Sequence, residues 1–293
     1  MPHDHPAPGL QAQLQVAALA SVELEADAAL DAGPGDETGQ CADRDFVASL
    51  ARGLAVIQAF SNQQHTLTIA KISQKTGIAR AAVRRYLHTL ASLGYVVTED
   101  GCRFSLLPKV VTLGQAYLSA TPLPTIAQQH LDVLAEQVGE ACSLGVLDGG
   151  DIVYLARAKS SSVMSPRFNV GGRLPAYCTS IGHVLLASLP PDVLESRLRE
   201  VRFVPYTQRT IASPEQLREH LDGVREDGFS IADQQLETGF RTIAVAVRNR
   251  AGAVVAGINV IVPVGRASVA QMQARYFEPL MQTAEKLGAA LAP

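Results

Sequence analysis

Two short amphipathic helical patterns joined through a single glycine constrain the fold of this chain most. The segment IAKISQKT follows Thr68, a residue type that caps helix N-termini, and Gly77 ends it. The next pattern, ARAAVRRYLHTLASLG, has its apolar residues at helical spacing on one face and closes on a second glycine. That apolar face consists of Val83, Leu87, Leu90 and Leu93. This order predicts two helices joined by a glycine turn.

The flanking segments extend the pattern on both sides. Residues 46–60 carry an apolar stripe at spacings of three and four, which predicts a preceding helix. After Gly94, the stretch YVVTEDGCRFSLL contains two short β-rich runs around Asp100-Gly101, a strong signal for a hairpin. A winged helix-turn-helix consists of these elements in this order: helix, helix, glycine turn, helix and hairpin. We assign this fold to residues 45–107.

The mean charge of the chain hides a segregation along it. The formal net charge of −3 gives no reason to expect nucleic acid as a partner. By segment, however, residues 1–44 carry −7, residues 45–120 carry +5 and the remainder carries −1. A basic segment of domain length beside a near-neutral one is typical of a nucleic-acid reader joined to another module, although an uneven surface would give the same count. Residues 1–44, rich in Ala, Gly, Asp and Pro, are expected to be a disordered acidic extension.

The basic residues of the third helix lie where a DNA reader needs them. A helix in the major groove presents its first turns to the base edges, while its partner helix crosses the backbone. Arg80, Arg84 and Arg85 occupy those turns, away from the apolar stripe. Lys71 points outward from the preceding helix and Arg103 lies in the hairpin, so both are expected at the DNA as well. The alternative is that these cations only form a solvated face.

At this point the residues resemble a known family. The stretch RGLAVIQAF, then TIAKISQKTGIARAAVRRYLHTLASLGYV, is similar to the DNA-binding domain of IclR-type bacterial transcription regulators. The resemblance continues through RLPAYCTSIGHVLLA and LETGFRTIAVAVRNRAGAVVAGINV and covers residues 45–290. The segments ARAAVRRYL and NVGGRLPAYCTS most resemble the PcaR/PcaU/PobR branch of the family, which responds to aromatic acids and β-ketoadipate-pathway intermediates. His183 departs from the pattern, because members usually carry Arg or Lys there.

The second half of the chain predicts an α/β sensor domain. Residues 108–121 are expected to form a linker helix that the two prolines of TPLPT end, and a new helix is expected from Thr125 to Val138. A hairpin around Gly149-Gly150 and a buried helix in CTSIGHVLLASL are expected next. A helix that Ser213 caps and Gly228 ends, three late strands and a final helix follow. The whole chain is therefore α+β. The resemblance implies that residues 122–293 form a GAF/PAS-like effector-binding domain.

The candidate effector site begins at the helix in CTSIGHVLLASL. Backbone N–H groups at a helix start lack intrahelical partners and favour an anion such as a carboxylate. The resemblance, matched position by position, implies a pocket of five residues: Ser180, Ile181, Asp233, Thr242 and Asn259. Arg241 carries a positive charge but points to the opposite face of a regular strand from its neighbour Thr242. Arg167 and Arg173 are expected at the surface.

An enzymatic function is the weaker alternative. Cys178 precedes His183 by five residues, which on a helix places the two about 140° apart, and no third orienting group is evident. The four scattered cysteines predict no disulfide framework, and the histidines lack the spacing of metal ligands. No catalytic residue, metal or cofactor is therefore expected. Without an apolar run of about 20 residues or a secretory signal, a cytoplasmic location is expected.

The sequence therefore predicts a ligand-responsive, DNA-binding transcription regulator. Its expected partners are promoter DNA, a small-molecule carboxylate effector and further copies of itself in a homodimer or tetramer, with no membrane. The expected effector is an aromatic or dicarboxylic acid metabolite whose catabolism the protein controls. Two alternatives remain: an IclR-type regulator of a different small-molecule pathway, and a metabolite sensor whose winged domain contacts protein.

Overall fold

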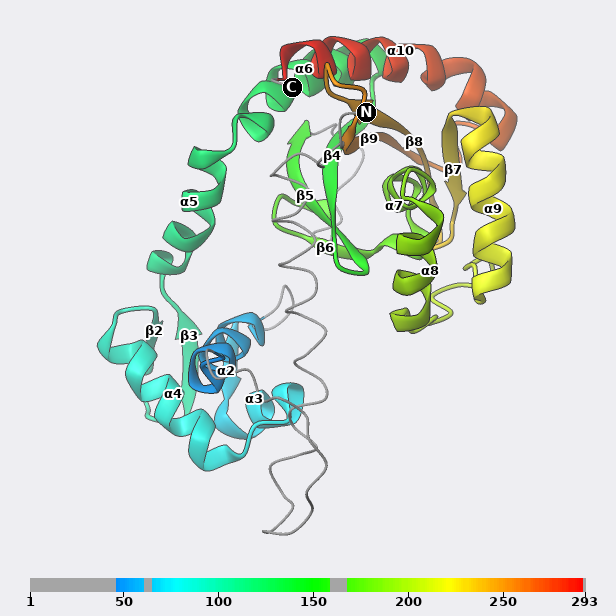
Figure 1. The fold of residues 1–293 in the computed structure, drawn as a ribbon. Helices are drawn as coiled ribbons and strands as arrows, with labels where there is room; N and C mark the ends of the chain where they lie inside the picture. The colour runs from blue at the N-terminus through cyan, green and yellow to red at the C-terminus, as the bar shows by residue number, and fades with distance from the viewer. Residues whose placement is uncertain (1–45, 61–64, 159–167, 292–293) are drawn as a thin grey trace, which may run out of the picture. The chain divides into compact units, whose positions relative to one another are not determined.

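The computed structural model describes residues 46–60, 65–158 and 168–291. The acidic extension, residues 1–44, and Arg167 lie outside this part of the chain. The described residues form two compact units, one ending at Thr121 and one beginning at Pro122 (Figure 1). Each unit has a hydrophobic core of its own. None of the described helices is long and apolar enough to cross a membrane.

The first unit is a winged helix-turn-helix, as expected. Its helices are α2 (Ala48–Gln58), α3 (Ile69–Thr76) and α4 (Arg80–Ser92), and its strands are β1 (Thr66–Thr68), β2 (Val96–Val97) and β3 (Arg103–Leu106). The strands form an antiparallel sheet in the order β1-β3-β2. Strand β1 was not expected, because three residues are too few to give a period-two signal in the sequence.

The helix boundaries follow from local chemistry. The Thr68 hydroxyl accepts a hydrogen bond from the Lys71 amide, and Gly77 takes the left-handed conformation (φ 72°) that ends α3. Val83, Leu87 and Leu90 of α4 are buried, as the stripe predicts. Leu93 is 53% exposed, which corrects the expectation for this residue. Leu93 is the C-terminal cap of α4, where the helical periodicity no longer decides which way a side chain points.

The helix α2 turns much of its apolar stripe away from the core. Val56 is fully buried, whereas Leu50 and Leu54 are 63% and 45% exposed. Since exposed large apolar residues in a row on one helix are uncommon in a monomer, this face of α2 is a candidate contact surface.

The connection between the units corrects a second expectation. A 3-10 turn, η1 (Pro108–Val110), leads into α5 (Val111–Ala120), and α6 runs over Pro122–Val138 rather than starting at Thr125. The two prolines of TPLPT thus begin a helix instead of only ending one. Proline is tolerated in a first turn because the N–H it lacks would have no intrahelical acceptor there. The break lies at Thr121, which is extended, as a residue before proline prefers.

The second unit is built on one antiparallel sheet of six strands in the order β6-β5-β4-β9-β8-β7. Its strands are β4 (Ala141–Asp148), β5 (Asp151–Ala158), β6 (Arg173–Pro175), β7 (Phe229–Asp233), β8 (Phe240–Arg248) and β9 (Val254–Pro263). Its further helices are η3 (Ala176–Cys178), α7 (Ser180–Ala187), α8 (Pro191–Glu200), α9 (Pro214–Asp227) and α10 (Val269–Ala290). The expected hairpin, late strands and final helix are all present, and α8 and β6 are additional.

Helices cover the sheet on both faces. Helices α6 and α10 lie side by side on one face, and α7, α8 and α9 contribute to the core on the other (Figure 1). The central strand β9 is therefore buried on both sides, which explains why GINVIVP is a continuous apolar run rather than an alternating one. The unit has the architecture of a GAF/PAS-like α/β domain.

Two glycines of the sheet and one of α7 set how closely this helix docks. A Cβ at Gly257 or Gly145 would lie 3.1 and 3.4 Å from the side chain of Ile181, so the two glycines leave room for that side chain. A Cβ at Gly182 would lie 2.0 Å from the carbonyl oxygen of Ala176. Only glycine at position 182 therefore lets the first turn of α7 lie against η3.

Candidate functional site

The exposed face of α4 carries the basic residues singled out in the sequence. Arg80, Arg84 and Arg85 are all exposed, and within the described part of the chain their guanidinium groups have no hydrogen bond or ion pair. Lys71 on α3 is exposed, and its ammonium group donates to Gln74 of the same helix. Arg103 is exposed on β3. The first unit thus presents these five cations at its surface.

Two other basic residues of this segment serve the fold. The Lys75 ammonium group donates to the Ala59 carbonyl at the end of α2 (2.9 Å). The Lys109 ammonium group donates to the Leu93 carbonyl (2.8 Å) and lies 5.0 Å from the centre of the Tyr95 ring. The excess positive charge of residues 45–120 is therefore divided between a surface function and the closing of helix ends, a division that charge counting does not reveal.

The tip of the wing is shaped by Asp100. Its carboxylate accepts hydrogen bonds from the amides of Arg103 (2.7 Å) and Cys102 (2.9 Å), and these bonds lower the pKa of Asp100 below its ordinary value. Gly101 next to it takes a positive φ of 68°. The turn fixes where β3 begins and so where Arg103 leaves the sheet.

The second unit contains a small cavity between its sheet and the α7 side. Its volume is about 30 Å³, and its wall comes from strands β5, β7, β8 and β9, from the β7–β8 loop and from the start of α7. The lining residues are Tyr154, Phe168, Cys178, Thr179, Ala232, Gln235, Leu236, Glu237, Phe240, Thr242 and Asn259. This volume is far below the roughly 300–1,000 Å³ of pockets that hold drug-sized ligands, so a larger ligand requires part of the wall to move outward.

Three aromatic rings form the apolar part of this wall. The rings of Tyr154 and Phe168 meet edge to face at 6.5 Å between centroids, and those of Phe168 and Phe240 at 6.1 Å. Such edge-to-face arrays present both ring faces and ring edges to a third ring. The cavity therefore suits a flat, aromatic ligand.

The polar part of the wall holds buried acceptors without partners. Tyr154 and Asn259 both belong to this wall, and burial raises the pKa of Tyr154, so the phenol stays protonated. The side-chain oxygens of Asn259 and Gln235 are buried and have no hydrogen-bond partner in the described residues. Leaving a buried polar atom unpaired costs about 1–3 kcal/mol, so the two amides are places for a ligand's polar groups.

The first turn of α7 faces the same region. Thr179 caps this helix, and its hydroxyl accepts from the Gly182 amide (3.2 Å). The amides of Ser180 and Ile181 precede the first intrahelical hydrogen bonds, as at any helix start. The Ser180 hydroxyl is fully buried and has no partner in the described residues. Amides, helix dipole and hydroxyl together suit an anion.

Only some of the five proposed effector residues lie at the cavity. Thr242 and Asn259 line the cavity, and Ser180 is buried directly beside the lining residue Thr179. The Ile181 side chain packs into the space left by the sheet glycines. Asp233 lies outside the cavity lining, and its carboxylate is ion-paired with Arg241 and Arg209. Arg241 points away from the cavity, as its strand position predicts, and Arg173 is half exposed and paired with Asp148.

Several wall residues were not identified from the sequence. Tyr154, Phe168 and Phe240 come from three separate segments, and Gln235 and Glu237 come from a loop. The alternation of β5 gives Tyr154 one face of its strand, but only the packing of α7 shows which face encloses a cavity.

Cys178 and His183 do not form a nucleophile and base pair. Nε2 of His183 lies 2.9 Å from the Tyr177 carbonyl, and Nδ1 lies 2.9 Å from the Ser230 hydroxyl and 3.0 Å from Nε2 of His220. Both ring nitrogens thus face groups other than the thiol. Burial raises the pKa of Cys178 to about 12, with Asp151 adding to the effect, so the thiol stays protonated.

His183 predicts a measurable dependence of stability on pH. Burial, and then the neighbouring His220, lowers the pKa of His183 to about 3. The unfolded imidazole is protonated below pH 6.5, so stability falls by about 1.4 kcal/mol per pH unit as the pH drops from 6.5 towards 3. His183→Gln removes this term. We expect its deficit in unfolding free energy at pH 7 to shrink by about 2 kcal/mol at pH 5 in urea titrations. A deficit that is equal at both pH values would contradict a neutral His183.

The described residues contain no group of three or more His, Cys, Asp and Glu side chains arranged to hold a metal ion. Two candidate sites remain: the basic surface of α4 and the wing, and the cavity beside the first turn of α7.

Comparison with known proteins agrees with this pair of features. Residues 49–100 match the model of the IclR helix-turn-helix domain, and residues 115–289 match that of the bacterial transcriptional regulator IclR C-terminal domain. The Pca regulon regulatory protein of Pseudomonas putida is 47% identical over 84% of this chain and 84% of its own length.

Two solved structures extend the likeness. A putative transcriptional regulator from Rhodococcus sp. RHA1 matches with a TM-score of 0.70 and 41% identity over 83% of this chain and 97% of its own. A double mutant of the PobR inducer-binding domain from Acinetobacter, in complex with 3-hydroxybenzoic acid, matches with a TM-score of 0.55 and 29% identity over 57% and 98%. The family's members regulate transcription and are not enzymes. The chain belongs to the IclR family of bacterial transcription regulators.

Proposed function

We propose that this regulator binds its promoter through α4 and the wing, and that a hydroxylated aromatic acid in the cavity of the second unit controls this binding. Arg80, Arg84 and Arg85 on α4, with Lys71 and Arg103, are the proposed DNA contacts. Residues 45–107 would form the reader, 108–121 the linker and 122–293 the effector domain. Since promoter DNA is cytoplasmic in bacteria, the protein would act there.

We propose a hydroxylated aromatic acid because unpartnered polar atoms lie beside an aromatic wall in the cavity. A carboxylate fits the amides and hydroxyl at the start of α7. A ring hydroxyl, which is a donor, fits the side-chain oxygens of Asn259 and Gln235. The aromatic rings accommodate the body of the ligand. A dicarboxylic acid finds no cation among the described lining residues for its second carboxylate, and Glu237 in the wall repels that extra charge.

A thermal-shift screen of the full chain tests this proposal. Ligands that bind the folded state raise the melting temperature by mass action. We expect 3-hydroxybenzoate, 4-hydroxybenzoate or protocatechuate to raise it in a concentration-dependent way, and adipate and β-ketoadipate to do so less. A shift with the dicarboxylic acids alone would reject the aromatic class, and no shift with any acid would reject the cavity as an effector site.

Asn259→Leu gives the matching variant experiment. Leucine is similar in size but offers no polar atom to the ligand. We expect the effector dissociation constant to rise about tenfold or more, because a hydrogen bond to a buried group is lost. Thr283→Val, on α10 at the opposite face of the sheet, is the control and should leave effector binding unchanged.

We further propose that the DNA-binding units associate through a second copy of the chain. Two of the helices of the first unit expose apolar side chains: Val47, Leu50 and Leu54 at α2, and Val111, Leu113 and Tyr117 on α5, each 45–69% exposed. Helix-turn-helix proteins read two half-sites as dimers, because one small domain contacts too few base pairs for specificity. The apolar faces are thus assigned to a partner copy, in a dimer or in a tetramer of two dimers.

Leu50→Glu tests this contact. A charge in an apolar interface disfavours association, so we expect the variant to lose the tighter binding of a promoter fragment with two half-sites over one with a single half-site. Electrophoretic mobility titrations of both fragments measure this ratio. Val170→Glu, at an exposed apolar residue of the other unit, is the control. An unchanged ratio in Leu50→Glu would remove α2 from the interface.

A further inference from the structure

We propose that Asp233 is a positioning residue of the effector site, which holds the loop carrying Gln235, Leu236 and Glu237 in the cavity wall and ties it to the start of α10, without contacting the effector. This inference rests on the proposed function, since it concerns the same cavity. It departs from the assignment of Asp233 as an effector contact.

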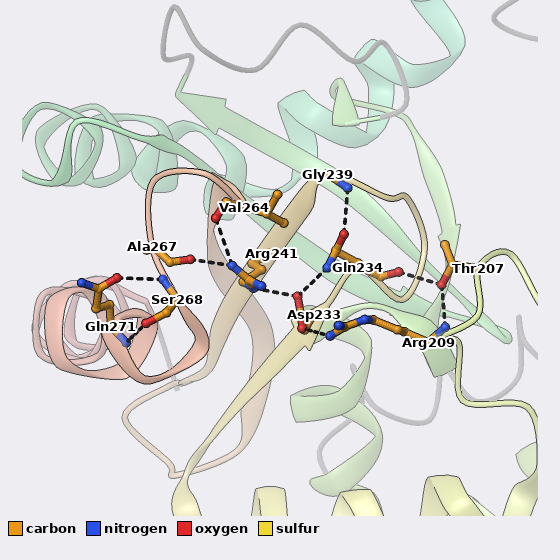
Figure 2. Close-up of polar contacts among 10 residues, drawn as sticks. All are labelled: Thr207, Arg209, Asp233, Gln234, Gly239, Arg241, Val264, Ala267, Ser268 and Gln271. Atoms are coloured by element: carbon orange, nitrogen blue, oxygen red, sulfur yellow. Dashed lines mark hydrogen bonds and ion pairs between the residues drawn. The ribbon is translucent and has the colours of Figure 1, made fainter.

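The carboxylate of Asp233 is fully engaged by other groups (Figure 2). Its Oδ1 accepts from Nε of Arg241 (2.7 Å) and from Nε2 of Gln234 (3.2 Å), and its Oδ2 accepts from Nη1 of Arg209. The Asp233 and Arg241 side chains are only 18% and 16% exposed. They face each other as a cross-strand pair of β7 and β8, on the side away from the cavity-lining residue Thr242.

The same groups hold a loop whose backbone is strained. Gln234 has a φ of 59°, and it is the one residue other than glycine with a positive φ in the described chain. The side-chain oxygen of Gln234 accepts a hydrogen bond from the backbone N–H of Gly239 (3.3 Å). The backbone N–H of Gln234 donates to the Phe240 carbonyl (3.0 Å), so the two ends of the loop are joined. The hydroxyl of Thr207 donates to the Gln234 carbonyl (2.7 Å). A strained turn persists only where its surroundings fix it.

The loop between these ends makes part of the cavity wall. Gln235, Leu236 and Glu237 all line the cavity, and the Gln235 carbonyl accepts from the Thr210 hydroxyl (2.6 Å). Of the other polar wall residues, Tyr154, Thr242 and Asn259 lie on paired strands, and Thr179 is held as the N-cap of α7. Because a benzoate-sized ligand needs more space than the cavity offers, the loop is the part of the wall that adjusts, and the Asp233 contacts determine how.

Arg241 extends the connection to α10. Its Nη1 donates to the carbonyls of Ala267 (2.7 Å) and Val264 (3.1 Å). Ser268 follows at once and starts α10 with a capping box to Gln271 (Figure 2). Helix α10 packs along α6, which only Thr121 separates from the linker helix α5. A shift of the loop is thus passed through the Asp233 and Arg241 side chains to the start of α10, which packs on the helix that follows the linker.

Four variants of the full chain test the inference: Asp233→Asn, Arg241→Gln, the double variant, and Arg218→Ala as control. The control breaks a different ion pair of this unit, Arg218–Glu195 (2.7 and 2.9 Å), which joins α9 to α8. The readouts are amide hydrogen exchange of residues 234–239 in the ligand-free protein, and dissociation constants for 3-hydroxybenzoate and 4-hydroxybenzoate.

We expect Asp233→Asn to speed the exchange of residues 234–239 about tenfold and to weaken both ligands by the same factor, leaving their ratio unchanged. The double variant should lose less than the sum of the losses in Asp233→Asn and Arg241→Gln, because both single variants lack the same Asp233–Arg241 pair. Arg218→Ala should alter neither readout. Unchanged exchange, a loss confined to one ligand, or additive losses in the double variant would each overturn the inference. If the wild type binds neither ligand, the proposed function fails, and the exchange measurement still decides whether Asp233 holds the loop.

Discussion

Replacing Arg84 by alanine is expected to weaken promoter binding about tenfold to a hundredfold. The Arg84 guanidinium group is exposed on α4, one turn after Arg80, and has no partner within the described residues that would keep it from DNA. A bidentate contact with a base contributes about 1–3 kcal/mol of discrimination, and each 1.4 kcal/mol is a factor of ten. Fluorescence anisotropy with a labelled promoter fragment measures the change.

The matched control for this variant is Arg202→Ala. Arg202 is an exposed arginine of the second unit, so the change in net charge is the same. We expect it to retain wild-type promoter affinity. Equal losses in the two variants would mean that net charge alone drives binding, and an unchanged affinity in Arg84→Ala would remove this residue from the interface.

Replacing Gly182 by alanine is expected to lower the free energy of unfolding by about 3 kcal/mol or more and to abolish effector binding. The new Cβ would lie 2.0 Å from the Ala176 carbonyl oxygen and 2.4 Å from the Ala176 Cα, and backbone atoms cannot rotate away as a side chain does. The first turn of α7, which carries Ser180 and the candidate anion-binding amides, must then move. Urea unfolding and a thermal-shift titration with 4-hydroxybenzoate measure the two effects.

Gly223→Ala is the control for this prediction. Gly223 lies inside α9, and a Cβ there meets no atom within 4 Å. Alanine in an open helical position stabilises a protein by up to about 1 kcal/mol, because the unfolded chain loses freedom. A Gly182→Ala protein as stable as the wild type would show that α7 docks differently from the packing described above.

The local signals in the sequence were sufficient for much of the fold. Thr68, Gly77 and Gly228 mark helix ends through caps and left-handed turns, which depend only on neighbouring residues. Expectations were wrong where a signal has two meanings. The prolines of TPLPT do end the linker helix as expected, but the next helix begins at Pro122 and not at Thr125. Proline suits a first turn as well as it interrupts an interior.

The candidate effector site depends on packing that the sequence does not contain. Thr242 and Asn259 meet at the cavity because β8 and β9 are neighbours and α7 covers that face of the sheet. Asp233, two strands from Asn259, was expected in the same pocket, but its carboxylate turns to Arg241 and Arg209 instead. Sequence position places a residue on a strand, whereas its cross-strand partner determines what its side chain contacts.

Promoter binding by the full chain, with and without a saturating effector, tests the central claim most directly. The claim is that one chain couples a DNA reader to an effector cavity. We predict that promoter affinity falls steeply with rising salt, and that the effector found in the screen changes the promoter dissociation constant at least about fivefold. Promoter affinity that is independent of salt, or that is the same with and without a bound effector, would contradict the account.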